Sequence, residues 1–362
     1  MKHKIIMLLM VALVVTMVGV AGCRPAGQVT WNSGTSNEGS GGYVANLGIA
    51  RLVSKYMTGL NYVSVPTGGS TQSVNLFGTG SGEIDACYPA NVSLYKAYRK
   101  IAPHPDVKWL PYQGLYFLSG DQMLVVKKDN TTIKSWGDLV GKKFYGSARG
   151  MTSFDIYQDV FTKMGIWSKM DVKEVGQSEV GDALSMGIID AVGVSGLSLR
   201  TLLPWGKDME TRVDIKVINP TPAEEKVISE VRGISAHYNV KLSAFAKDPG
   251  VSKVFSVSGL WGPAFAPYLD ADLVYQVMKV LDEHTDEWFE LAPGIGLVVD
   301  NGLAGATVLG IKSNPDIPVH AGIAKFLKEK GVWQNEWKIG EKIELSEAGM
   351  KKVWDLYGLV GR

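Results

Sequence analysis

The chain opens with a nearly unbroken run of apolar residues, Ile5 to Val20, which follows two lysines and a histidine. A short positive stretch before an apolar segment of this length is typical of an export signal and is short for a permanent membrane span. The pattern predicts a signal peptide over residues 1–22. We expect no later segment to be long and apolar enough to cross a membrane.

After the signal peptide, short strand-like apolar runs alternate with segments whose apolar residues recur at helical spacing. Strands are predicted over residues 28–33, 62–65, 84–88, 123–128, 171–175 and 189–194. Helices are predicted over residues 43–57, 70–77, 92–99, 153–164 and 179–187, with a short helix and then a strand within 133–144. From about Pro249 helices dominate, and one long amphipathic helix is predicted over 268–291. The alternation predicts an α/β fold.

Small polar residues gather in three loops, at residues 32–42, 66–70 and 146–153, each between a predicted strand and a predicted helix. In open α/β sheets, ligands sit beyond the carboxyl ends of strands, close to helix N-termini. There, backbone N–H groups lack intrahelical partners and the helix dipole favours negative charge. Three such loops from two lobes can converge on one anion.

Charge gives little sign of a nucleic-acid partner. The chain has 37 Lys and Arg and 36 Asp and Glu, a net charge of +1. Loss of Lys2 and Lys4 with the signal peptide leaves 35 against 36, a net charge of −1. Such a balance does not indicate binding to nucleic acid or to a strongly anionic surface. The mature chain is long enough for two α/β domains, each with its own core.

The two cysteines have different surroundings in the sequence. Val20-Ala21-Gly22-Cys23 resembles the lipobox of bacterial lipoproteins, in which the cysteine is acylated and becomes the first mature residue. The resemblance implies a lipid anchor on Cys23 that tethers the protein to a membrane surface without spanning it. The alternative is a plain signal peptide with a chance cysteine. If Cys23 is lipidated, Cys87 has no partner for an intramolecular disulfide.

Five segments, in this order, resemble the TAXI family of solute receptors, the extracytoplasmic binding proteins of a class of TRAP transporters. They are "SGGYVANLGIARLV", "PTGGSTQSVNLFGTGSGEIDA", "IKSWGDLVGKKFYGSARGMTS", "MGIIDAVGVSG" and "IPVHAGIAKFLKEKGVW". The likeness covers most of the mature chain. Its most specific parts are the Thr-Gly-Gly-Ser run and the late Pro-x-His segment.

The resemblance implies a type II periplasmic-binding-protein fold, with two α/β lobes joined by crossing strands and a ligand cleft between them. Lobe 1 is expected over 23–121, lobe 2 over 122–250, and a return to lobe 1 with C-terminal helices over 251–362. It implies a receptor without catalysis, cofactor or metal that delivers a small organic anion, such as glutamate or 2-oxoglutarate, to TRAP permease subunits. A hinge is expected near 115–122 and 251–262.

Three departures from the family pattern fall near the expected pocket. Pro89-Ala90-Asn91 replaces a Gln-Ser-Asp run, Arg149 enters a loop that usually lacks arginine, and Ser195-Gly196-Leu197 replaces a Gly-His-Pro-like turn. They leave the ligand open, because an apolar monocarboxylate fits the pattern as well as a diacid. A lipoprotein that presents its ligand to a membrane sensor instead of a permease also fits.

The candidate ligand contacts come from the three loops and from predicted strand ends. We expect N–H groups and hydroxyls of Thr67, Gly68, Gly69 and Ser70 to bind a carboxylate, although an ordinary helix cap explains the same residues. The remaining candidates are Ser33, Gly34, Thr35, Tyr43, Tyr88, Asn91, Thr152, Ser153 and Ser195. For Tyr43 the alternative is a half-buried helix residue.

Arg149 is the candidate for a carboxylate clamp, since a guanidinium can donate two parallel hydrogen bonds. The alternative is a solvated arginine or a salt bridge. Trp261 either walls the pocket or packs in the hinge, and His320 is read as structural. Enzyme motifs find little support: "GVSGL" lacks the final glycine of a nucleophile elbow, and the sequence has no Walker-type loop and no His-Glu-x-x-His.

Overall fold

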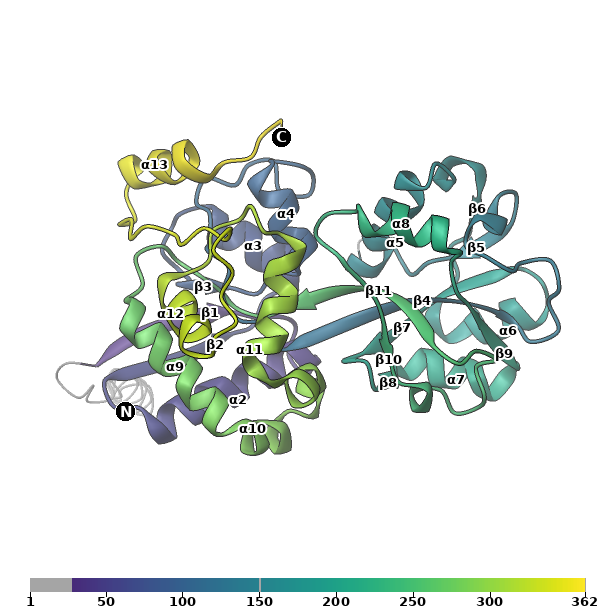
Figure 1. Cartoon of the computed structure of the whole chain (residues 1–362), viewed down its shortest axis with the longest axis horizontal. Helices are drawn as coiled ribbons and strands as arrows, with labels where there is room; N and C mark the ends of the chain where they lie inside the picture. The colour runs from purple at the N-terminus through teal and green to yellow at the C-terminus, as the bar shows by residue number, and fades with distance from the viewer. Residues whose placement is uncertain (1–27, 150, 362) are drawn as a thin grey trace, which may run out of the picture.

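A computed structural model describes residues 28–149 and 151–361 of the chain. The predicted signal peptide and Cys23 lie outside the described residues. The chain forms two lobes, and the long strands β4 (Leu118–Lys127) and β11 (Val254–Trp261) run between them (Figure 1). These two strands pair antiparallel, with Gly259 opposite Gly120.

The first lobe is built on a four-stranded sheet in the order β12-β3-β1-β2. Its strands are β1 (Val29–Gly34), β2 (Leu60–Val65), β3 (Ala86–Cys87) and β12 (Ala264–Phe265). The helices α2 (Gly41–Tyr56), α3 (Ser70–Gly78) and α4 (Asn91–Tyr98) follow β1, β2 and β3 in the chain. β1 pairs parallel with β2 and β3, so the loops after these strands open at one edge of the sheet. The structure thus has the strand-helix alternation that the sequence predicts here.

C-terminal helices cover the first lobe (Figure 1). They are α9 (Ala271–Glu283), α10 (Thr285–Leu291), α11 (Gly296–Ser313), α12 (Ala321–Glu329) and α13 (Glu347–Tyr357). The prediction of one long helix over 268–291 is wrong, because the helix breaks at His284, where φ is −120° and ψ is 32°. The His284 ring stacks on Tyr56 at 3.7 Å. The break turns α10 so that the buried Trp288 indole donates to the Ala45 carbonyl at 2.9 Å.

Within the described residues, one helical segment, Pro293–Ser313, is long and apolar enough to cross a membrane by length and composition. The sequence-based expectation that no such segment follows the signal peptide is therefore wrong by that criterion. Half of the segment is buried inside the protein, and a non-helical residue, Gly302, interrupts it. Leu303, Ala306 and Ile311 are fully buried in the first lobe's core, as in a core helix.

The second lobe is built on an eight-stranded sheet whose main order is β10-β11-β4-β7-β5-β6. Its other strands are β5 (Lys143–Tyr145), β6 (Asp171–Val172), β7 (Ala191–Leu197), β8 (Thr201–Leu202), β9 (Ile215–Ile218) and β10 (Ser235–Val240). Its α-helices are α5 (Thr152–Lys163), α6 (Val180–Ser185), α7 (Pro204–Arg212) and α8 (Pro222–Ser229). Single 3-10 turns lie at Gly137–Leu139, Trp167–Lys169, Gln177–Glu179 and Leu242–Ala244, and in the first lobe at Pro293–Ile295. The short helix expected within 133–144 is thus one 3-10 turn.

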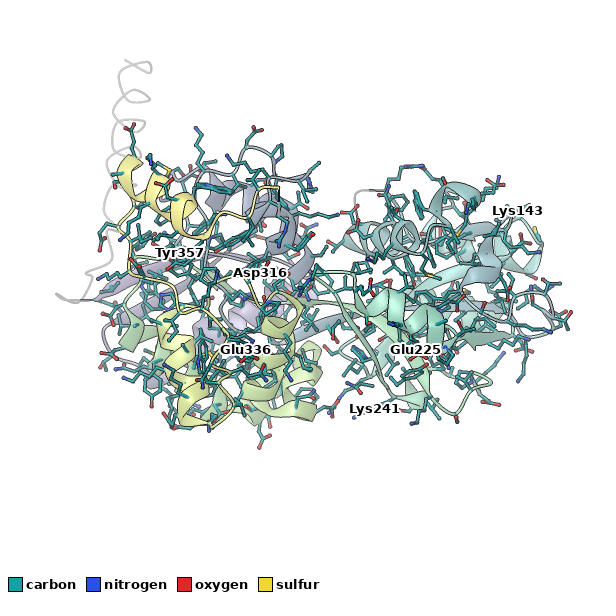
Figure 2. The ribbon with its side chains drawn as sticks, turned by 45° about the horizontal axis from the view of Figure 1, so that its top comes forward. Lys143, Glu225, Lys241, Asp316, Glu336 and Tyr357 are labelled. Atoms are coloured by element: carbon teal, nitrogen blue, oxygen red, sulfur yellow. The ribbon has the colours of Figure 1, made fainter. Side chains whose placement is uncertain are left out.

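Each lobe has aromatic side chains in its core. In the second lobe, Trp136 meets Phe161 and Phe255 with ring centroids 5.6 and 5.5 Å apart, and its Nε1 donates to the Ile218 carbonyl at 2.8 Å. In the first lobe, Phe117 meets Trp288 at 5.4 Å. Cys87 is a free, buried cysteine in this core. Figure 2 shows the side chains over both lobes, with Asp316 on the first and Lys241 on the second.

Candidate functional site

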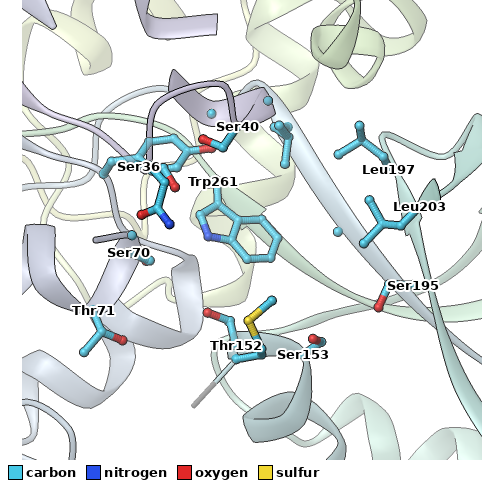
Figure 3. Close-up of a pocket in the computed structure, with 18 of the residues that line it drawn as sticks. Ser36, Ser40, Ser70, Thr71, Thr152, Ser153, Ser195, Leu197, Leu203 and Trp261 are labelled. Atoms are coloured by element: carbon cyan, nitrogen blue, oxygen red, sulfur yellow. The ribbon is translucent and has the colours of Figure 1, made fainter. Parts of the chain in front are cut away.

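A cavity of about 450 Å³ lies between the lobes, which is within the usual size of a small-molecule site (Figure 3). The first lobe lines it with Ser36, Asn37, Ser40, Gly41, Gly42, Gly68, Gly69, Ser70, Thr71 and Tyr88. The second lobe contributes Met151, Thr152, Ser153, Ser195, Gly196, Leu197 and Leu203. The crossing strands supply Leu118, Gly120, Gln122 and Trp261. A ligand in this cavity therefore contacts both lobes.

Three helices begin at the cavity wall: α2, α3 and α5. The N-cap of α2 is Ser40, whose Oγ accepts from the Tyr43 N–H at 3.2 Å. The N-caps of α3 and α5 are Gly69 and Met151, and neither has a side-chain cap. Because first-turn N–H groups have no intrahelical acceptor, all three termini present positive partial charge to the cavity. Such termini favour an anion.

Among the described residues that line the cavity, none is an aspartate, glutamate, lysine, arginine or histidine. The lining therefore offers an anion the partial positive charges of the helix N-termini and no ionised side chain. Neutral hydrogen-bonding groups and apolar side chains make up the rest of the lining. A group with one negative charge is compatible with such a wall, whereas each further charge requires a partner that the wall lacks.

Tyr88 brings a hydroxyl to the first-lobe side of the cavity. The side chain is 3% exposed and packs against α2 at Gly42, where an added Cβ would lie 2.5 Å from the Tyr88 Oη. Burial raises the pKa of Tyr88 above its usual range, so the hydroxyl keeps its proton. It has no hydrogen-bond partner among the residues that the structure describes. Tyr88 is thus a free neutral donor at the cavity.

Gln122 and Ser195 form a second polar pair, opposite each other on β4 and β7. The Ser195 Oγ donates to the Gln122 Oε1 at 2.7 Å, and both residues are almost fully buried. This bond orients the amide, because the oxygen is occupied and the Nε2 donors remain available. The pair offers donors from the second lobe and a crossing strand, across from α2 and α3.

The loop at residues 66–70 is held by its own side chains. The Thr67 Oγ1 donates to the Thr35 carbonyl at 2.6 Å, which fixes this loop to the end of β1. Gly69 has φ of +109°, a backbone conformation that favours glycine. The Ser70 Oγ accepts from the Ala90 N–H at 2.6 Å. The loop therefore presents Gly68, Gly69 and Ser70 to the cavity, while Thr67 supports them from behind.

The structure brings half of the sequence-predicted residues to the cavity wall. These are Gly68, Gly69, Ser70, Tyr88, Thr152, Ser153 and Ser195. The others do not line the cavity: Ser33, Gly34, Thr35, Tyr43, Thr67, Asn91 and Arg149. Ser33 and Thr35 are buried with no exposed surface, and Thr35 donates to the Val65 carbonyl at 2.9 Å. Tyr43 is half-buried on α2.

Arg149 and Asn91 are engaged elsewhere. The Arg149 side chain is 63% exposed, forms an ion pair with Glu174 and lies 5.2 Å from the Phe154 ring centroid. This placement corresponds to the salt-bridge alternative for Arg149. Asn91 is buried; its Nδ2 donates to Ser313 at 2.9 Å, and its Oδ1 accepts from the Leu260 N–H at 3.1 Å. Asn91 therefore ties α4 to α11 and to the crossing strand β11.

Sequence reasoning missed much of the wall. The missed residues are Ser36, Asn37, Ser40, Gly41, Gly42, Thr71, Leu118, Gly120, Gln122, Met151, Gly196, Leu197 and Leu203. The first five belong to the loop at residues 32–42, which the sequence marked. The cavity is lined by the part of this loop next to α2 and not by the part next to β1. Residues of β4 carried no local signal, because only the pairing of distant strands brings them to the cleft. Of the two alternatives for Trp261, a pocket wall or packing in the hinge, its place on the cavity lining corresponds to the pocket wall.

Ser258 and Asp121, both buried, form a cluster with the half-buried His237 on the strands β11, β4 and β10. The Ser258 Oγ donates to the Asp121 Oδ1 at 2.8 Å and lies 2.9 Å from the His237 Nε2. A nucleophile triad needs histidine between serine and acid, whereas here serine lies in the middle. The Leu199 N–H also donates to Asp121, at 2.7 Å. The cluster joins the crossing strands rather than activating a nucleophile. Among the described residues no group of three or more His, Cys, Asp or Glu could hold a metal ion.

Two α/β lobes on crossing strands, with a cavity between them, define this protein as having the fold of a periplasmic binding protein. The chain belongs to the NMT1-like family, whose model matches residues 34–331. No curated protein matches it.

Several solved structures resemble the chain at low identity. A TctC solute binding protein from Polaromonas is 13% identical, with 80% of this chain and 99% of that chain covered and a TM-score of 0.48. The periplasmic aliphatic sulphonate binding protein of Escherichia coli is 14% identical, with 83% and 90% covered and a TM-score of 0.42. A probable amino-acid ABC transporter extracellular-binding protein from Bacillus subtilis is 14% identical, with 79% and 98% covered and a TM-score of 0.42.

Proposed function

We propose that the protein is an extracytoplasmic solute receptor that binds a small organic anion between its lobes and delivers it to membrane permease subunits. One observation carries the proposal: three helix N-termini meet at a cavity whose lining, in the part of the chain that the structure describes, includes no charged side chain. Backbone N–H groups and neutral side-chain donors then bind the anion without a lysine or arginine side chain. The seven sequence-predicted residues on the wall are the proposed contacts.

The finer assignments rest on the sequence resemblance to the TAXI family. They are a TRAP-type permease as partner, a lipid anchor on Cys23, and a carboxylate as ligand, for which the resemblance implies glutamate or 2-oxoglutarate whereas the uncharged wall favours a single charge. The proposed lobe limits, 23–121, 122–250 and 251–362, fall within or close to the crossing strands β4 and β11. Chain crossings at these strands support a hinge there.

We expect a two-state clamp in which the ligand favours the closed form through contacts to both lobes. Two ion pairs connect the lobes on one side. Arg200 and Lys241 of the second lobe reach Asp300 on α11 of the first lobe at 2.6 and 2.9 Å. The hydrogen bond from Arg200, with one from Lys241, lowers the pKa of Asp300. On the other side, Lys96 of α4 lies 3.2 Å from Asp159 of α5.

Replacement of Asp300 by asparagine removes two of these ion pairs and is expected to weaken ligand binding about two- to thirtyfold. The pairs are partly exposed, so each contributes about 0.2–1 kcal/mol to closure. Dissociation rates measured by stopped-flow fluorescence test this. Asp214→Asn is the matched control, because its ion pair with Lys247 at 2.6 Å lies within the second lobe. Equal effects of both variants would contradict a role for Asp300 in closure.

A thermal-shift panel tests the function itself. Ligands that bind only the folded protein raise the melting temperature by mass action. We expect organic acids to raise it, and matched amides or amines of the same carbon skeleton to leave it unchanged. Ser70→Ala should reduce the shift, whereas Arg149→Ala, exposed and paired with Glu174, should not. A panel in which neutral or cationic compounds stabilise the protein and anions do not would refute anion binding.

A further inference from the structure

The Trp261 indole lines the cavity and reaches two glycines of the crossing strands with one edge of its ring. Gly120 on β4 and Gly259 on β11 are opposite each other in the strand register. A Cβ at Gly120 would lie 2.8 Å from the Trp261 Cζ3, and one at Gly259 would lie 2.7 Å from its Cη2. Any larger residue at either position would push the ring away. The paired glycines thus leave room for the Cζ3–Cη2 edge of the indole against the crossing strands.

The rest of the indole borders the cavity. In Figure 3 the Trp261 ring lies in the middle of the pocket, with Ser70 to its left, Thr152 below it, and Leu203 and Ser195 to its right. The ring is only half-buried, and it lines the cavity. Its Nε1 has no hydrogen-bond partner among the described residues. A rigid aromatic surface with one free donor at its edge is therefore available to a ligand.

The cavity has two chemically different walls. Leu118, Leu197, Leu203 and Met151 give the cavity its apolar surface, which Gln122, Ser195 and the start of α5 at Thr152 interrupt. The N-termini of α2 and α3 and the Tyr88 hydroxyl form the polar wall. Placing a second carboxylate on the apolar wall costs free energy, because no lining cation offsets its lost hydration. The face of an indole also carries negative quadrupole density, which disfavours an anion lying on it.

We infer that the ligand is an organic anion with a single charged group and a planar ring, which stacks on Trp261. This inference rests on the proposed function and names the ligand class for the same cavity. The acid group lies at the N-termini of α2 and α3, and the ring lies between Trp261 and the leucine side chains. Trp261, Gly120 and Gly259 determine the specificity for the ring.

Titration calorimetry on the wild-type protein tests the class without any variant. The probes are benzoate and phenylacetate as planar monoanions, cyclohexanecarboxylate as a non-planar match, and glutamate and 2-oxoglutarate as dicarboxylates. We expect the aromatic acids to bind about two- to tenfold more tightly than cyclohexanecarboxylate, and more tightly than the dicarboxylates. Tighter binding of a dicarboxylate would overturn the inference and leave the receptor function standing. If no organic anion binds, the proposed function fails as well.

Variants locate the ring. Trp261→Leu is expected to weaken binding of the aromatic acid about tenfold and to leave the weak binding of acetate unchanged, whereas Trp261→Phe should retain most of the affinity. Gly120→Ala displaces the indole and keeps it present, so it should also weaken the aromatic acid selectively. Melting temperatures without ligand show which variants fold. If Trp261→Leu and Gly120→Ala both fold and bind benzoate as the wild type does, stacking on Trp261 is excluded.

Discussion

Replacement of Ser40 by aspartate is expected to abolish anion binding while the protein remains folded. Ser40 is the N-cap of α2 and lines the cavity. Aspartate caps a helix about as well as serine, and its charge is favourable next to the helix N-terminus. The same charge repels a bound anion. At about 5 Å and an effective dielectric constant of about 20, the repulsion is about 3 kcal/mol, or at least about a 100-fold loss of affinity.

Ser40→Asn is the matched control, because asparagine is also a good cap and carries no charge. We expect its dissociation constant to stay within about threefold of the wild type, and both variants to melt near the wild-type temperature. Calorimetry with one organic acid compares the three proteins. Equal binding by the aspartate and asparagine variants would show that the anion does not sit at the start of α2.

Acid is expected to destabilise the folded protein strongly below about pH 6.5, through buried histidines. Burial lowers the pKa of His104 and of His320 from 6.5 to about 4. Lys96 further lowers the pKa of His104, while Asp270 and a hydrogen bond to Leu269 partly oppose the shift at His320. The unfolded chain therefore takes up protons between pH 6.5 and 4 that the folded protein does not. The contribution of these two histidines to the free energy of unfolding is fully present above about pH 6.5, and it is lost as the pH drops towards 4.

The expected loss is roughly 2.5 kcal/mol for each of these histidines at pH 4.5, relative to pH 7. Urea unfolding at the two pH values measures it. His320 caps α12, and its Nδ1 accepts from the Gly322 N–H at 3.2 Å. His320→Asn can keep a cap and removes the titrating group. Between pH 7 and pH 4.5, the free energy of unfolding of this variant should therefore fall by about 2.5 kcal/mol less than that of the wild type. An unchanged pH dependence in this variant would exclude His320 as a source of the effect.

The α/β architecture could be predicted from the sequence because it is encoded locally. The strands and helices from β1 to α4 follow from apolar spacing, and they match the structure to within a few residues. The break between α9 and α10 could not be predicted, since the helical spacing of apolar residues continues through His284. There, stacking on Tyr56 and the burial of Trp288 determine the turn, and both partners are more than 200 residues away in sequence.

The sequence predicted which loops form the candidate site, but only some of the residues that line it. Chemistry marked the Gly-Gly-Ser run and the helix start at Thr152, and both line the cavity. The sequence does not show in which direction a side chain points. Ser33 lies in the buried interior, and Arg149 points outward to Glu174. The position of Trp261 depends on the register of two strands, which places Gly120 opposite Gly259 at one edge of the indole. No local pattern reveals that register.

The most direct test is a crystal structure of the protein with the organic anion that stabilises it most in the thermal-shift panel. The account predicts the anion between the lobes, with its acid group within hydrogen-bonding distance of N–H groups at the start of α2 or α3 and with no lysine or arginine side chain on it. An anion bound outside the cleft, or one whose acid group is held by a lysine or arginine side chain, would contradict it.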